Sequence, residues 1–122
     1  METKFNFNSQ ICTSRSQSER LLALGLKKET ADFPVWGTEK LLYMGWSLHR
    51  LIEIMPTTIK SRYGYVNLAV NAELVQYQYY DEDYMHNECC QHFNDGTLYD
   101  NIIDCIDWLI KEGYFNKEYL ED

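Results

Sequence analysis

The chain has 122 residues, which is room for one domain, and we expect a single domain over residues 1–122. No apolar run is long enough to span a bilayer, and residues 1–10 lack the apolar core of a signal peptide. The net charge of −8 argues against direct binding to nucleic acid or to an anionic membrane. These features together predict a cytoplasmic protein.

The charge is distributed unevenly along the chain. Residues 1–72 hold nine basic and six acidic residues, whereas residues 73–122 hold two basic and thirteen acidic residues. The net charges of the two segments are therefore +3 and −11. We favour the interpretation that the two halves face each other in one fold and partly compensate. The alternative is a polar surface that orients a protein partner or a second copy of the chain.

Three helices are predicted by residues that start and stop helices, over 14–24, 47–55 and 97–112. Each begins at a hydroxyl side chain suited to an N-cap and ends before a glycine or proline: Ser14 with Gly25, Ser47 with Pro56, and Thr97 with Gly113. The third helix also carries an apolar stripe at helical spacing, which predicts that it packs on the core.

Alternating apolar and polar residues predict strands between residues 65 and 93. Two alternating runs and a third probable strand over 84–93 form an antiparallel three-stranded meander. The short apolar run over 40–44 is compatible with a further strand, and 27–37 is predicted as a loop. The fold class is α+β, a small antiparallel sheet with the three helices packed mainly on one face.

The segment 86–92 contains side chains of the types that bind zinc. On a strand, one face would present His86, Glu88, Cys90 and His92. Alternate residues lie about 7 Å apart along a strand, which is long for adjacent ligands of one tetrahedral ion. A polar strand face with reduced thiols is therefore favoured, and a metal site is the alternative.

Sequence motifs for catalysis are lacking in this chain. It contains no nucleophile elbow, no dinucleotide-binding glycine motif and no phosphate-binding loop. We therefore expect no cofactor and favour a noncatalytic protein. The acidic run over 81–83 lacks the spacing of a calcium loop and is predicted to be a solvated turn.

Tyrosines cluster around one predicted hairpin. The residues concerned are Tyr77, Tyr79, Tyr80 and Tyr84. Aromatic side chains with polar tips are enriched at protein interfaces, which makes this cluster a candidate interaction surface. The alternative is that tyrosine is present only because it forms strands well.

Several segments in a fixed order resemble a known group of proteins. They are TSRSQSERLLALGL over 13–26, KETAD over 28–32, WSLHRLIEIMP over 46–56 and WLIKEGY over 108–114. Their order resembles small uncharacterised proteins of Bacteroides-type gut bacteria and their prophages. The resemblance implies a shared fold, carries no assigned activity or catalytic residue, and leaves out the variable stretch 81–96.

Three hypotheses for function follow from the sequence. The first is a noncatalytic protein-interaction or accessory protein of a phage or mobile element, acting on a protein partner or by self-association. The second is a small metal-dependent protein or enzyme that uses the segment 86–92. The third is an acidic mimic of nucleic acid that occupies a basic partner.

Overall fold

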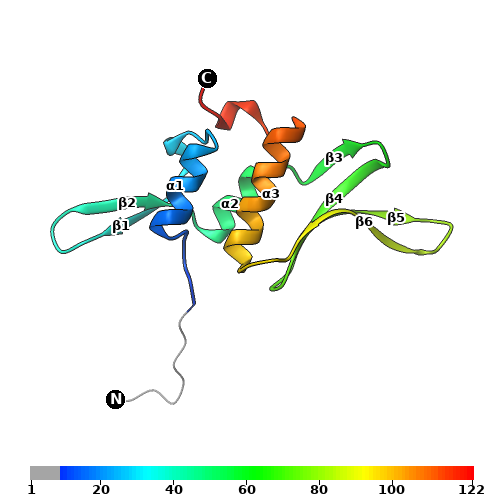
Figure 1. Cartoon of the computed structure of the whole chain (residues 1–122), viewed down its shortest axis with the longest axis horizontal. Helices are drawn as coiled ribbons and strands as arrows, with labels where there is room; N and C mark the ends of the chain where they lie inside the picture. The colour runs from blue at the N-terminus through cyan, green and yellow to red at the C-terminus, as the bar shows by residue number, and fades with distance from the viewer. Residues whose placement is uncertain (1–8) are drawn as a thin grey trace, which may run out of the picture.

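The fold was analysed in a computed structural model, which describes residues 9–122. The described chain is α+β, with helices in the middle and β-structure at both ends (Figure 1). Its helices are α1 (Arg15–Ala23), α2 (Leu48–Ile54) and α3 (Leu98–Glu112), with 3-10 turns η1 (Lys28–Thr30) and η2 (Lys117–Tyr119). Its strands are β1 (Phe33–Trp36), β2 (Leu41–Gly45), β3 (Thr58–Ser61), β4 (Gly64–Val70), β5 (Val75–Asp81) and β6 (His86–Phe93).

The larger sheet is a four-stranded antiparallel meander in the order β3-β4-β5-β6. It contains the three predicted strands and adds β3. Strand β3 was not predicted, because Ile59 is the one apolar residue of its four and no alternating run is visible. The third predicted strand begins two residues later than expected, because residues 82–85 form the turn that joins it to β5.

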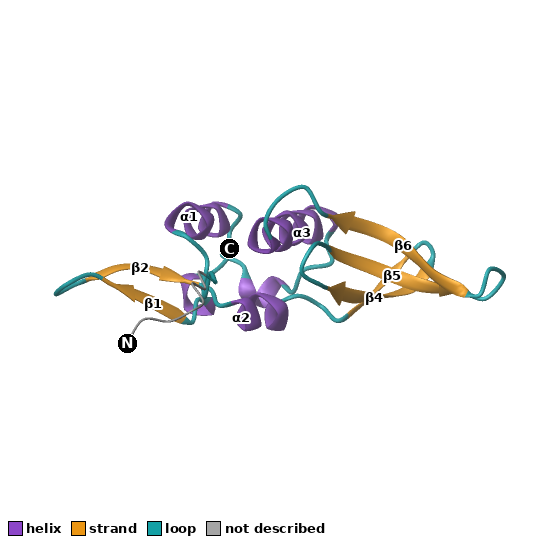
Figure 2. Cartoon of the chain, turned by 90° about the horizontal axis from the view of Figure 1, so that it is seen from below, coloured by secondary structure: helices purple, strands orange, loops and turns teal. Residues whose placement is uncertain are grey.

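The smaller sheet corrects the prediction of a loop over 27–37. Strand β2 occupies the predicted run at 40–44, but it pairs with β1 in a separate two-stranded hairpin. Pro34 lies in β1 and discourages a strand prediction, yet it is tolerated because β1 is an edge strand. Figure 2 shows this hairpin and the larger sheet extending from opposite sides of the helices.

Helix α3 makes the main helical contact with the larger sheet. Helix α3 packs on β5 and β6, and α1 contacts β2 and α3. Local signals set the ends of α3: the Thr97 hydroxyl accepts from Asp100 N at 3.2 Å, and Gly113 adopts φ 80°. None of the helices in the described chain is long and apolar enough to cross a membrane.

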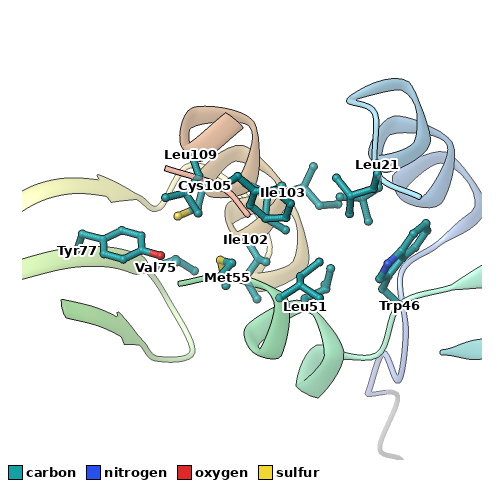
Figure 3. Packing of buried hydrophobic residues seen from close by; sticks show 14 of the residues in the cluster. Leu21, Trp46, Leu51, Met55, Val75, Tyr77, Ile102, Ile103, Cys105 and Leu109 are labelled. Carbon is teal, nitrogen blue, oxygen red and sulfur yellow. The ribbon is translucent and has the colours of Figure 1, made fainter. Parts of the chain in front are cut away.

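The core runs through α3 from the first hairpin to the larger sheet. Figure 3 shows Trp46 and Leu21 at one end and Tyr77 at the other, with α3 side chains between them. The predicted stripe of α3 is buried, and full burial contributes about 1.5–3 kcal/mol for each large apolar side chain. The cysteines Cys12, Cys89, Cys90 and Cys105 are free thiols.

Trp46 joins three segments at the base of the first hairpin. Its backbone N–H donates to Thr13 Oγ1 at 2.9 Å, and its carbonyl accepts from Thr13 N at 2.9 Å. Its indole Nε1 donates to Thr30 Oγ1 at 3.0 Å, inside the protein. The Thr30 carbonyl in turn accepts from Arg50 Nη1 at 2.9 Å, which ties η1 to α2.

The substitution Trp46→Phe tests this junction. It removes the indole N–H, leaves Thr30 Oγ1 without a donor and opens a small cavity. We expect the free energy of unfolding to fall by about 1–3 kcal/mol, measured by urea denaturation.

The matched control is Trp36→Phe, which makes the same chemical change at a side chain that is 65% exposed. It should alter the free energy of unfolding by less than about 0.5 kcal/mol. Equal losses in the two variants would contradict a special role for Trp46.

Candidate functional site

The segment 86–92 lies on β6, but a β-bulge interrupts its alternation. Tyr77 pairs with Gln91 and Gln78 pairs with Cys89, so Cys90 is the extra residue between the two pairs. A bulge changes which face the following side chains occupy. The single polar face that the sequence predicted for this strand is therefore divided.

The four predicted metal ligands are distributed over separate places. His86 Nε2 lies 2.5 Å from Glu88 Oε1, with both side chains about half exposed. Cys90 is partly buried and packs against the core, whereas His92 Nδ1 lies 3.6 Å from Cys89 Sγ. Among the described residues no group of three or more His, Cys, Asp or Glu side chains is placed to hold a metal ion.

The pair His86–Glu88 favours a charged imidazole. The ring Nδ1 lies 3.0 Å from the Tyr84 carbonyl, and this contact is the first cause that raises the pKa of His86. The hydrogen bond to Glu88 raises it further. Both partners are solvated, so this is a surface ion pair of small energetic weight.

We expect the pKa of His86 to lie above the ordinary histidine value and to fall in the variant Glu88→Gln. A raised folded-state pKa means that protonation favours the folded state at low pH. This contribution is lost as the pH rises through the folded pKa. An NMR titration of the His86 ring checks both statements, and an unchanged pKa in the variant would contradict the ion pair.

The distance of 3.6 Å between Cys89 Sγ and His92 Nδ1 is compatible with a catalytic cysteine and its general base, but no other property of the pair is. Although Cys89 is exposed as a residue, desolvation at its sulfur raises the thiol pKa, and the neighbouring Cys90 raises it further. A catalytic thiol needs the opposite shift, toward the thiolate. The pair therefore lacks the electrostatics of an activated nucleophile.

The prediction that Tyr77 belongs to an exposed interaction surface is wrong. This side chain is fully buried against α3, its hydroxyl donates to the Pro56 carbonyl at 2.6 Å, and burial raises its pKa. Tyr79 is partly buried and stacks on Tyr63 at 5.4 Å between ring centroids. Side chains alternate between the two faces of β5, so Tyr77 and Tyr79 lie on the same face, and this face meets the helices.

The remaining two tyrosines are exposed. Tyr80 lies at the solvent-facing end of β5 with 56% exposure, and Tyr84 lies in the turn before β6 with 72% exposure. They flank the acidic run over 81–83, of which Asp81 ends β5 and residues 82 and 83 lie in the turn. They remain candidates for contact with a partner.

Exposed apolar side chains also lie on the first hairpin, where no site was predicted from the sequence. Trp36 is 65% exposed and pairs directly with Leu41 across the hairpin, and Leu42 beside it is also exposed. The hairpin over residues 33–45, here called the β1–β2 arm, projects away from the helices (Figure 2). The apolar runs FPVW and LLYM on either side of the polar segment GTEK are the sequence pattern from which this hairpin could have been predicted.

Two pockets border these elements. An apolar groove of about 230 Å³ lies between α1 and β2, lined by residues that include Arg15, Leu22, Lys28, Tyr43 and Met44. A second pocket of about 340 Å³, here called the Trp108 pocket, lies where the β3–β4 turn and β6 meet the end of α3. Its walls include Arg62, Tyr63, Cys90, Trp108, Glu112 and Tyr114.

Comparison of the chain with protein-family models, with curated proteins and with solved structures gives no match.

Proposed function

We propose that this chain is a noncatalytic protein-interaction protein that binds its partner through the β1–β2 arm. The observation that carries the proposal is the exposure of Trp36 beside Leu41 and Leu42 on a projecting hairpin. Tryptophan is among the residues that contribute most to protein interfaces, and exposed apolar side chains that lie together favour an interaction site. Tyr80 and Tyr84 are weaker candidates, because a partner would also have to desolvate the carboxylates between them.

The arm is held in place at its base, which lowers the entropic cost of binding. Asp32 N donates to the Gly45 carbonyl at 3.2 Å, and the Tyr43 hydroxyl donates to the Thr13 carbonyl at 3.2 Å. Gly45 lies so close to residue 13 that an added Cβ would come within 3.2 Å of the Thr13 carbonyl. A surface that is already ordered loses little conformational freedom when a partner docks.

The groove beside the arm indicates the chemistry of the partner. Its lining is mainly apolar, with Leu22 and Met44 among its walls. The groove is lined by two cations, Arg15 and Lys28, and by one carboxylate, Glu19, so its net charge is positive. Arg15 stacks over the Tyr43 ring at 5.2 Å, and neither cation forms an ion pair within the described residues. A protein segment with large apolar side chains flanked by carboxylates would match both the groove and these cations.

In this proposal the protein acts in the cytoplasm as an accessory protein of a phage or mobile element. That origin rests only on the resemblance over 13–26, 28–32, 46–56 and 108–114. The gene neighbourhood tests it, and a neighbourhood of unrelated housekeeping genes would count against it.

Trp36→Ala tests the proposed binding mode. Quantitative affinity capture from the source cells, with wild type and variant as bait, should show a partner whose recovery falls at least about tenfold. Binding of that purified partner, measured by calorimetry, should weaken to a similar degree. Charge reversal at Arg15 and Lys28 should weaken binding and reduce its dependence on salt.

The control is Tyr65→Ala, which removes a ring with 69% exposure from the larger sheet, far along the chain from the arm. It should leave recovery of the partner unchanged. A partner lost equally with both variants, or no partner that depends on Trp36, would overturn the proposal.

A further inference from the structure

The Trp108 pocket is separate from the β1–β2 arm and has three aromatic walls. Tyr63 comes from the β3–β4 turn, Trp108 from α3, and Tyr114 from the segment after α3. The rings of Trp108 and Tyr114 lie 5.6 Å apart between centroids, with their planes inclined at 48°. Two inclined rings form a corner that can contact a compact group from two directions.

Other aromatic rings support these walls from behind. Trp108 packs on Tyr77 at 6.0 Å and on Phe93 at 6.2 Å, both measured between ring centroids. Tyr63 is stacked nearly parallel on Tyr79, with planes 7° apart. The walls are therefore ordered before any ligand binds, which is what a small-molecule site needs.

The pocket also carries one charge of each sign. Glu112 follows Trp108 by four residues, so the two side chains share a face of α3. Across the pocket, Arg62 lies over the Tyr63 ring at 4.8 Å, and its Nη2 donates to the Tyr63 hydroxyl at 2.7 Å. Neither charged group forms an ion pair with the other or with another described residue.

Glu112 occupies an electrostatically unfavourable position on α3. It is the last residue of α3, where the helix dipole disfavours a negative charge. It is exposed at the rim of an aromatic pocket and, within the described chain, has no basic partner to offset that cost. A carboxylate beside aromatic rings is the arrangement that attracts an organic cation.

We propose that the Trp108 pocket binds a small zwitterion that joins an alkylated ammonium group to a carboxylate or phosphate. The ammonium group would contact the rings of Trp108 and Tyr114 beside Glu112, through cation–π and Coulomb attraction. The anionic group would accept hydrogen bonds from the Arg62 guanidinium. The volume of about 340 Å³ suits a small solute of this class.

Calorimetry with the full chain tests the proposal, with glycine betaine and phosphocholine as probes. Choline and acetate serve as half-ligands that each carry only one of the two charges. We expect at least one zwitterion to bind about tenfold more tightly than either half-ligand, because it engages both charged walls. Co-sedimentation with phosphatidylcholine vesicles distinguishes a lipid headgroup from a free solute, and either source supports the shared chemistry.

Charge-neutral variants locate the binding site. Glu112→Gln and Arg62→Gln should each weaken zwitterion binding about tenfold, since each removes one charged contact. The matched controls are Glu118→Gln and Lys60→Gln, which alter exposed charges that do not line the pocket. All four positions are exposed, so circular dichroism should show an unchanged fold.

Three results would overturn the proposal. One is the absence of saturable binding for both zwitterions at millimolar concentration. Another is choline binding as tightly as the zwitterions, which would leave Arg62 without a role. The third is equal weakening in the pocket variants and in their controls. None of these results bears on the Trp36-dependent partner of the β1–β2 arm, so the two proposals fail independently.

Discussion

The burial of Trp46 between Thr13 and Thr30 is the interaction on which the rest of the arrangement depends. Its backbone pairs with Thr13, its indole N–H is satisfied by the Thr30 hydroxyl, and the residue itself is fully buried. The chain leaves this residue in two directions, into β2 on one side and toward α2 on the other. One buried aromatic side chain therefore sets where the β1–β2 arm begins and how the helices meet it.

The helices form a central block between the two proposed binding surfaces. Charge compensation across this block follows the favoured interpretation of the sequence, since Arg20 pairs with Asp104 at 2.7 Å and approaches Asp107 at 3.6 Å. These exposed pairs add little stability, but they join the mildly basic first half to the acidic second half. The β1–β2 arm and the larger sheet lie on opposite sides of the helices (Figure 1), and the Trp108 pocket borders β6 of that sheet.

The candidate sites were predicted from the sequence only in part. Period two correctly implied that Tyr77 and Tyr79 share a face, but only packing against α3 decided that this face is the buried one. The strand containing 86–92 was predicted, whereas the bulge at Cys90 was not, because a bulge depends on the partner strand. Trp36 was predicted to lie in a loop, whereas it lies in β1, paired with Leu41 and 65% exposed.

By itself the sequence determined the three helices with their ends, the alternation of the central strands and a break in the chain after the second of them. Caps and alternation act within a few residues, so the local chain contains their cause. Only the tertiary structure decided that 33–36 pairs with 41–45, and that Arg62 and Glu112 border one pocket. Pairing, burial and convergence of distant side chains depend on contacts across the whole chain, and no local pattern encodes those contacts.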